Sequence, residues 1–294
     1  MPLKDWLAAV AVIVAWGLNF VVIKLGLHEL PPFLMGGLRF SLVVLAVFFV
    51  KRPAVSWTML AMYGVTISLG QFAFTFTAMA IGMPAGLASL VVQAQAFFTV
   101  LISAMLLGER IRRHHVLGMA IAAVGLVLIQ QGQESVSVPV LGFVLTLCAA
   151  LSWACGNIVV KRIGKVDMMG LVIWGALIPP IPFFILSWLF EGREQIEYSL
   201  AHISFVGVGA LVYLALLGTV MGYVLWGRLL TRHPVAKVAP LSLLVPVVGL
   251  IAATVFVDEH LAFIQWVGGL VVLLGLIVNV FGMQFVARLK AMRG

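Results

Sequence analysis

The sequence predicts an all-α integral membrane protein with ten transmembrane helices in two inverted five-helix repeats, and three observations support this fold class. Of its 294 residues, 63% are hydrophobic and 10% are charged, whereas a soluble domain carries about 25% charged residues. Ten apolar stretches have about the length that a bilayer requires. Finally, the second half of the chain repeats features of the first. This composition excludes a soluble enzyme and a nucleic-acid-binding protein.

The predicted membrane segments are separated by short connections, which leave no room for a soluble domain. A helix needs about 20 apolar residues to cross a bilayer core. The ten segments are Trp6–Ile23, Pro31–Val50, Trp57–Ala80, Pro84–Leu107, Val116–Gln131, Pro139–Val160, Met168–Phe190, Ile203–Leu230, Pro234–Val257 and Leu261–Val286. The fifth is short and is open to an earlier start at its basic flank. The longest polar connection, Glu191–His202, is expected to be a loop.

The basic residues predict the orientation of the chain, because Lys and Arg concentrate in the cytoplasmic connections of membrane proteins. With the N-terminus in the cytoplasm, 15 of the 18 Lys and Arg fall on the cytoplasmic side. The outer side keeps Lys24 and Arg193 together with seven of the ten acidic residues, and Arg39 lies inside a helix. We therefore expect both termini in the cytoplasm and interpret the net charge of +8 mainly as a topology signal.

The two halves of the chain repeat each other in opposite orientation. Residues recur at an offset of 150 or, in the first helix of each half, 137: Tyr63 and Tyr213, Pro84 and Pro234, Glu109 and Glu259, Gly118 and Gly268, Gly125 and Gly275, Trp16 and Trp153, Lys24 and Lys161. Each half has five helices, an odd number, so the halves enter the membrane in opposite senses. Inverted repeats are typical of secondary transporters, whose site lies near the midplane between the repeats. We expect the repeats at residues 1–131 and 139–294.

Short motifs spread over nearly the whole chain carry a family resemblance. They include Trp16-Gly-Leu-Asn-Phe-Val-Val-Ile-Lys24, Met83-Pro-Ala-Gly-Leu-Ala-Ser-Leu90, Gly108-Glu-Arg110, Trp153-Ala-Cys-Gly-Asn157 and Ala239-Pro-Leu-Ser-Leu-Leu-Val-Pro246. These motifs resemble the drug/metabolite transporter superfamily, specifically its EamA-type exporters. The resemblance implies a bacterial inner-membrane exporter of small amino acids and their metabolites, such as cysteine and O-acetylserine. A multidrug exporter or an exporter of other small metabolites is the alternative within the superfamily.

Polar and aromatic side chains inside the predicted helices are the candidates for a substrate site. A zwitterionic amino acid loses its water there, so fixed dipoles must replace that water. Trp16 and Asn19 share a helical face, as do Trp153 and Asn157. The candidate substrate-binding residues are Trp16, Asn19, Arg39, Gln71, Gln93, Gln95, Trp153, Asn157 and Tyr223. The alternatives are hydrogen bonds between helices for the amides and an interfacial belt for the tryptophans.

The segment Pro84–Leu107 carries polar residues on two faces. Gln95, Thr99 and Ser103 form one stripe, while Ser89 and Gln93 lie on nearly the opposite side of a regular helix. The two stripes are therefore expected not to face the same cavity.

Four charged residues within or next to the predicted helices have expected roles beyond topology. Arg39 lies inside an apolar stretch. One possible role is to attract a substrate carboxylate. The alternative is a structural role, in which its side chain snorkels outward or binds carbonyls at broken helix ends. Lys24 is expected to anchor its helix at the outer interface. Glu109 and Glu259 are expected to be structural residues at helix ends, with proton coupling as the alternative.

Helix breakers and small residues predict which helices bend and which pack tightly. Prolines interrupt the segments Met168–Phe190 and Pro234–Val257, where freed carbonyls line a cavity or form a hinge. Two pairs of glycines lie seven residues apart on one helical face: Gly118 with Gly125 and Gly268 with Gly275. Such pairs permit close helix contact, so their helices are expected to form a scaffold away from the transport path.

Several mechanisms lack the residues that they need. No Asp, Glu or His falls in the middle of a predicted helix, whereas proton-coupled export of cations uses an embedded carboxylate. A facilitator or an exchanger fits better. The pair His114–His115 lacks metal-ligand spacing, and no Gly-rich phosphate loop supports direct use of ATP. We expect no enzyme activity, cofactor, metal site, ATPase subunit or nucleic-acid partner, but only a small-molecule substrate and membrane lipid.

Overall fold

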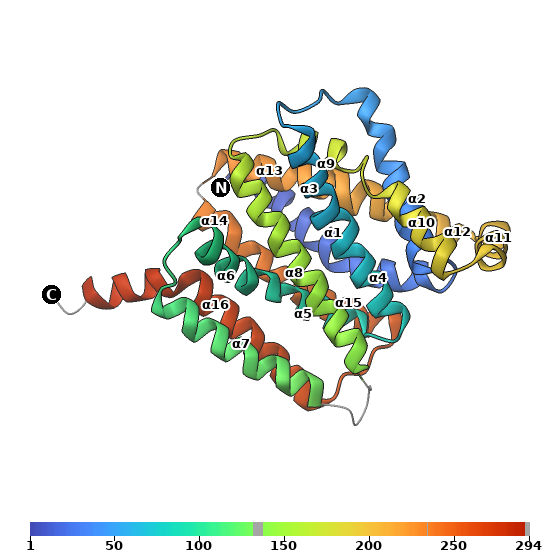
Figure 1. Ribbon diagram of the computed structural model, residues 1–294. Helices are drawn as coiled ribbons and strands as arrows, with labels where there is room; N and C mark the ends of the chain where they lie inside the picture. Colours follow the sequence, from blue (N-terminus) through green and yellow to red (C-terminus); the bar gives the residue numbers. More distant parts are fainter. Residues whose placement is uncertain (132–137, 234, 292–294) are drawn as a thin grey trace.

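Helices make up the fold throughout the described residues (Figure 1). A computed structural model describes residues 1–131, 138–233 and 235–291. Pro234, expected to begin the ninth segment, and residues 292–294 of the second repeat, Arg293 among them, lie outside these ranges. The helices of the first half are α1 Leu3–Leu27, α2 Pro32–Val44, η1 Leu45–Phe49, α3 Trp57–Tyr63, η2 Gly64–Gly70, α4 Gln71–Ala80, α5 Ala85–Val91, η3 Val92–Ala94, α6 Gln95–Leu107 and α7 Arg113–Gln131.

The second half has a corresponding succession of helices. They are α8 Val140–Ile163, α9 Met168–Gly175, α10 Pro180–Phe190, α11 Arg193–His202, α12 Phe205–Val212, η4 Tyr213–Met221, α13 Gly222–Arg232, α14 Val235–Val238, η5 Ala239–Leu243, α15 Leu244–Val257 and α16 Phe263–Ala291. Nine stretches of the described residues are long and apolar enough to span a membrane, and Leu241–Val257 is a shorter apolar helix. This agrees with the all-α membrane fold.

The structure refines three boundaries. The fifth span begins at Arg113, within its basic flank. The seventh span is broken between Gly175 and Pro180, as its prolines predict. The ninth consists of α14, the 3₁₀ segment η5 and α15, because a proline within a helix removes a backbone donor.

The loop expected at 191–202 is wrong: α11 forms there, and its Arg193 pairs with Glu197 one turn later at 2.5 Å.

The helices α7 and α16 lie side by side at one edge of the molecule (Figure 1). A Cβ atom on Gly118 would lie 2.7 Å from the carbonyl oxygen of Gly275, and one on Gly125 would lie 2.6 Å from that of Gly268. Only hydrogen at these positions lets the two backbones approach so closely. The predicted tight packing is confirmed, and none of the described residues of this pair lines the cavity described below.

The third and eighth spans share an unusual feature. Each contains a π-helical segment, η2 in the first half and η4 in the second, that begins beside the equivalent residues Tyr63 and Tyr213. Such segments occur frequently at functional sites because they widen the helix and redirect its side chains. Both repeats therefore carry the same irregularity near the centre of the bundle.

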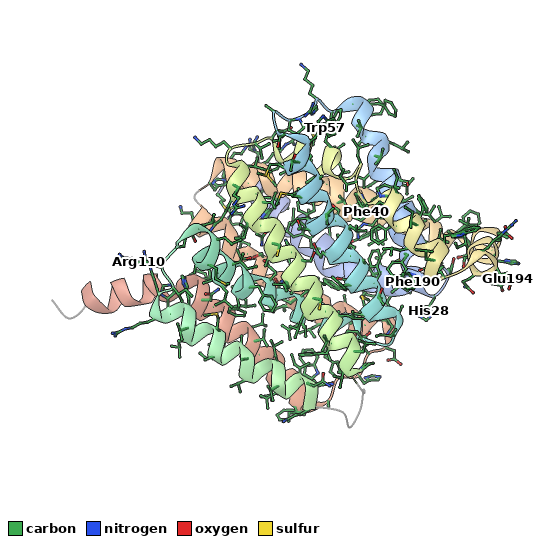
Figure 2. The ribbon with its side chains drawn as sticks, viewed as in Figure 1. His28, Phe40, Trp57, Arg110, Phe190 and Glu194 are labelled. Carbon is green, nitrogen blue, oxygen red and sulfur yellow. The ribbon has the colours of Figure 1, made fainter. Side chains whose placement is uncertain are left out.

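Charged and aromatic side chains mark two ends of the bundle. In Figure 2, Trp57 lies at the top and Arg110 at the left of the view, whereas His28, Phe190 and Glu194 lie toward its right. We name these ends after two lysines that lie near them. The Lys161 end holds the connection between α6 and α7, and the Lys24 end holds α11 and the start of α5.

Candidate functional site

A cavity of about 400 Å³ lies between the two halves of the chain. Its walls come from α1, α2, α3, η2, α4, α5, η3 and α6 of the first half and from α8, α9, η4, α13, η5 and α15 of the second. All nine candidate residues named from the sequence line it: Trp16, Asn19, Arg39, Gln71, Gln93, Gln95, Trp153, Asn157 and Tyr223. All of them lie inside predicted membrane segments, with Asn157 and Asn19 nearest to a segment end, so the cavity lies within the bundle.

The cavity is not equally closed toward its two ends. At the Lys24 end it is bounded by Ile23, Thr75 and Ser89, which are at most 3% exposed. Toward the Lys161 end its lining continues to Met168 and Leu230, which are half-buried and lie near the ends of their helices. The cavity is therefore sealed at the Lys24 end and extends toward the other.

The fourth span lines the cavity from two sides. Ser89, Gln93 and Gln95 all contribute to the wall, so the expectation that the two polar stripes face different environments is wrong. The reason is local. The 3₁₀ segment η3, Val92–Ala94, separates α5 from α6, and its tighter turn rotates the second stripe relative to the first.

A polar cluster joins the two repeats on one side of the cavity. Asn157 on α8 donates from Nδ2 to Gln95 Oε1 at 2.8 Å and to Thr99 Oγ1 at 3.1 Å. Both amides thus line the cavity while bonded to each other. The structural alternative, a hydrogen bond between helices, is present for this pair.

Aromatic rings form another wall. The Trp16 ring centroid lies 5.4 Å from that of Tyr223 and 5.5 Å from that of Trp226. Its Nε1 donates to the carbonyl oxygen of Gly218 at 3.1 Å, which fixes the indole against η4. The placement is inside the bundle rather than in an interfacial belt, and it gives the cavity a large apolar face.

Arg39 is buried in this cavity with 1% of its surface exposed. Its Nη2 donates to Thr219 Oγ1 at 3.0 Å, and its Cζ lies 3.9 Å from the centroid of the Phe72 ring. Thr219 in turn donates to the carbonyl oxygen of Leu214 within η4. The snorkelling alternative is therefore wrong, because the guanidinium lies inside the bundle. Among the described residues it is the one charged side chain that lines the cavity.

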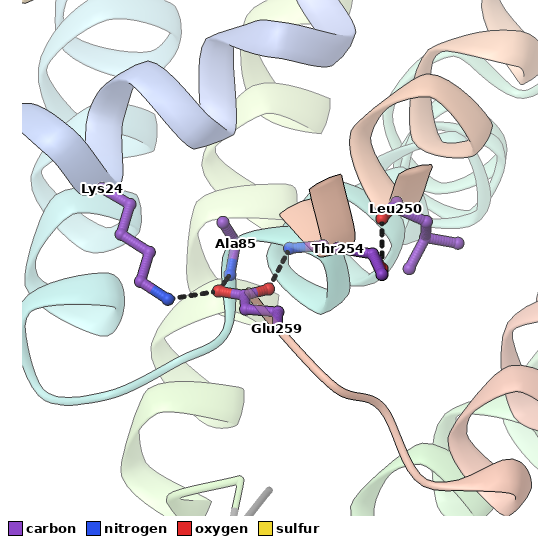
Figure 3. Close-up of polar contacts among 6 residues, drawn as sticks. Lys24, Ala85, Leu250, Thr254 and Glu259 are labelled. Carbon is purple, nitrogen blue, oxygen red and sulfur yellow. Dashed lines mark hydrogen bonds and ion pairs between the residues drawn. The ribbon is translucent and has the colours of Figure 1, made fainter. Parts of the chain in front are cut away.

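Sequence reasoning missed the partner of Lys24. Glu259 follows α15 and is 5% exposed, and its carboxylate accepts hydrogen bonds from Lys24 Nζ at 2.8 Å, Ala85 N at 2.8 Å and Gly86 N at 3.0 Å (Figure 3). Lys24 therefore pairs with a carboxylate of the other repeat, whereas the sequence predicted only an interfacial anchor. The helix-end role expected of Glu259 is confirmed, since it caps the first turn of α5.

The equivalent pair lies at the other end. Lys161 Nζ is 2.9 Å from both carboxylate oxygens of Glu109 and donates to Ser103 Oγ at 3.1 Å. Glu109 is 52% exposed. The signal for both pairs was present in the sequence, because the lysines and the glutamates each recur between the halves, but no local pattern shows that each lysine meets the glutamate of the opposite repeat.

The comparison with known proteins agrees with this architecture. A model of the EamA-like transporter family matches residues 4–131 and 140–281. The chain belongs to the EamA-like transporter family. It is 50% identical over 291 residues, 97% of each chain, to a protein of Escherichia coli strain K12 named "Probable amino-acid metabolite efflux pump". A protein of Salmonella typhimurium with the same name is 51% identical over 290 residues, again 97% of each chain.

More distant relatives share the fold. An Escherichia coli protein named "Uncharacterized inner membrane transporter YedA" is 26% identical over 94% of this chain and 90% of its own length. A crystal structure at 19% identity superposes with a TM-score of 0.64 over 94% of this chain and 95% of the other. By its family and its apolar helices the chain is a multi-pass membrane transporter, and two of its relatives are named as probable amino-acid metabolite efflux pumps.

Proposed function

We propose that this EamA-like transporter exports small amino acids and their metabolites, cysteine and O-acetylserine among them, by alternating access. The observation that carries the proposal is the central cavity between two inverted repeats, which is sealed at one end and extends toward the other. Inverted repeats let the two ends exchange roles around a fixed site. A volume of about 400 Å³ falls at the small end of ligand pockets and fits a metabolite of this size.

The orientation follows from the distribution of charge. Lys and Arg are concentrated in the connections at the Lys161 end, which supports a cytoplasmic location for this end and for both termini. The conformation described here then has a cavity directed toward the cytoplasm, as an exporter requires when it receives its substrate. The Lys24–Glu259 pair, together with the helix start that Glu259 caps, is proposed to hold the outer end closed in this conformation.

The lining favours transport without proton coupling. Apart from Arg39, the side chains of the described residues that face the cavity are neutral, and an exchanger or a facilitator needs no embedded carboxylate. Lipophilic cations would meet the positive charge of Arg39 without a compensating acid. The multidrug alternative is therefore disfavoured by electrostatics as well as by the relatives' names.

The test is uptake of radiolabelled cysteine and O-acetylserine into proteoliposomes, with and without an imposed pH gradient. We expect saturable uptake that exceeds uptake by protein-free liposomes and does not respond to the gradient. If the pH gradient stimulates uptake, the proposed substrates stand but the uncoupled mechanism is overturned. Uptake of lipophilic cations in place of both metabolites would overturn the substrate class.

A further inference from the structure

The cavity contains four buried polar atoms that have no hydrogen-bond partner. Two are donors, Nε and Nη1 of Arg39, and two are acceptors, Oδ1 of Asn19 and Oε1 of Gln71. All three residues line the cavity and are at least nine-tenths buried. Buried polar groups in native proteins are nearly always paired, so this concentration of unpaired atoms around one space indicates a ligand that supplies the missing partners.

The buried guanidinium of Arg39 favours an anionic ligand. Its charge is balanced by no carboxylate among the described residues of the cavity wall; its contacts are the Thr219 hydroxyl and the faces of nearby phenylalanine rings. A guanidinium forms its strongest hydrogen bonds with carboxylate or phosphate oxygens. The neutral Thr219 hydroxyl orients the group and leaves the unpartnered N–H groups available.

The two amides belong to the same cavity wall as the arginine. A Cβ atom on Gly218 would meet Asn19 Oδ1 at 2.5 Å, so this oxygen lies against η4, the segment that also carries Thr219, to which Arg39 donates. Gln71 precedes Phe72, whose ring stacks beneath the guanidinium. One anion-binding group and two acceptors, from α2, α1 and α4, therefore line the same cavity without a partner.

We propose that Arg39 binds the carboxylate of an α-amino acid and that the side-chain oxygens of Asn19 and Gln71 accept hydrogen bonds from its ammonium group. The substrate is thereby recognised as a zwitterion, and its side chain faces the aromatic wall formed by Trp16 and Tyr223. This inference rests on the proposed transport of small amino acids and specifies which groups of the substrate are recognised. It also explains why the site tolerates a buried arginine without an acidic partner.

The first test uses the wild-type transporter and leaves its fold untouched. Unlabelled cysteine, cysteine methyl ester and N-acetylcysteine compete with radiolabelled cysteine for uptake into proteoliposomes. The ester lacks the carboxylate, and the N-acetyl compound lacks the ammonium. We expect each modified compound to compete at least tenfold more weakly than cysteine. Equal competition by either one would overturn the corresponding half of the site, while absence of any cysteine uptake would instead contradict the proposed function.

The second test assigns the recognition to residues. Arg39→Gln removes the charge at similar size and is expected to raise the KM for cysteine at least tenfold, and Arg39→Lys is expected to restore part of the affinity. Asn19→Leu and Gln71→Leu are expected to weaken the binding of cysteine more than the binding of N-acetylcysteine. Arg52→Gln, at an exposed arginine stacked on Trp57, is the matched control and should leave the KM unchanged. An unchanged KM in correctly inserted Arg39→Gln protein would overturn the proposal.

Discussion

The two Lys–Glu pairs at opposite ends of the cavity are built from equivalent residues, yet they lie in different surroundings. Glu259 is 5% exposed and holds Lys24 together with two backbone N–H groups of α5, whereas Glu109 is 52% exposed and receives its hydrogen bonds from Lys161 among the described residues. The ion pair is common to both ends and the helix cap is not. We therefore expect the cap, more than the ion pair, to keep the Lys24 end closed.

Capping across the chain is a general feature of the Lys24 end. Glu191 accepts hydrogen bonds from the backbone N–H groups of Phe33 and Leu34 at the start of α2, at 2.5 and 3.0 Å. Glu29 similarly accepts from Ser204 before α12. Each carboxylate satisfies donors that a helix start leaves unpaired, and each ties together two segments distant in the sequence. These contacts tie together the segments of the Lys24 end, whereas the Lys161–Glu109 pair caps no described helix start.

Swapping the two charges within each Lys–Glu pair should distinguish the effect of the helix cap from that of the ion pair, and we expect the largest effect here. Lys24→Glu combined with Glu259→Lys keeps two opposite charges, but an ammonium at residue 259 cannot accept from Ala85 N and Gly86 N. We expect cysteine transport by this variant to fall roughly tenfold or more, a factor that corresponds to about 1.4 kcal/mol. The matched reversal of Lys161 and Glu109 should change transport less than about threefold, since exposed pairs contribute about 0–1 kcal/mol.

Both reversed proteins conserve net charge, and their insertion is checked by size-exclusion chromatography in detergent. Similar losses of transport at the two ends would show that the charges alone matter and would contradict the distinction between them.

Replacing each of the two glutamates by glutamine should lower the stability of the folded protein by different amounts. Glu259→Gln replaces charge-assisted hydrogen bonds in a buried site and is expected to cost about 1.5–3 kcal/mol. Glu109→Gln removes an exposed pair and is expected to cost less than about 1 kcal/mol. Thermal unfolding in detergent measures both, and equal shifts of the unfolding midpoint would argue against a structural cap at Glu259.

Cysteine labelling should report directly on which end is open. In a protein in which Cys148 and Cys155 are replaced by serine, Ser89→Cys lies at the sealed end and Met168→Cys at the other. We expect a membrane-impermeant maleimide to label Met168→Cys roughly tenfold faster, and Glu259→Gln to accelerate labelling of Ser89→Cys. The exposed Arg52→Cys serves as the positive control. Faster labelling of Ser89→Cys than of Met168→Cys in the unaltered background would reverse the assignment of the closed end.

Much of the fold and of the cavity could be predicted because both depend on local regularities. Apolar stretches of membrane length give the spans, and glycines at a seven-residue spacing give the contact of α7 with α16. Polar residues within such stretches are costly unless they face one another or a cavity. Asn19, Gln71 and Asn157 are found in the cavity wall for that reason.

The remaining features depend on contacts that no local pattern contains. Lys24 and Glu259 are 235 positions apart, so their pairing follows from the way in which the repeats interlock. The 3₁₀ segment Val92–Ala94 brings Gln93 and Gln95 to one cavity, but it contains no proline or glycine from which it could be predicted. Likewise, α11 was missed because its polar sequence was interpreted as a connection, although Arg193 and Glu197 are spaced to stabilise a helix.

The smallest expected effect concerns a cap that has no lysine. Hydrogen bonds from the Ser204 hydroxyl and backbone hold the pKa of Glu29 below its ordinary value of 4.5. A carboxyl group whose pKa is lowered by folding stabilises the protein above its unfolded pKa, and this contribution is lost as the pH falls through the folded value. Glu29→Gln should therefore lower the thermal unfolding midpoint slightly at neutral pH, and the difference from the wild type should shrink as the pH falls below about 4.5. Because Glu29 is more exposed than Glu259, a larger loss for Glu29→Gln than for Glu259→Gln would mean that burial does not determine the strength of these caps.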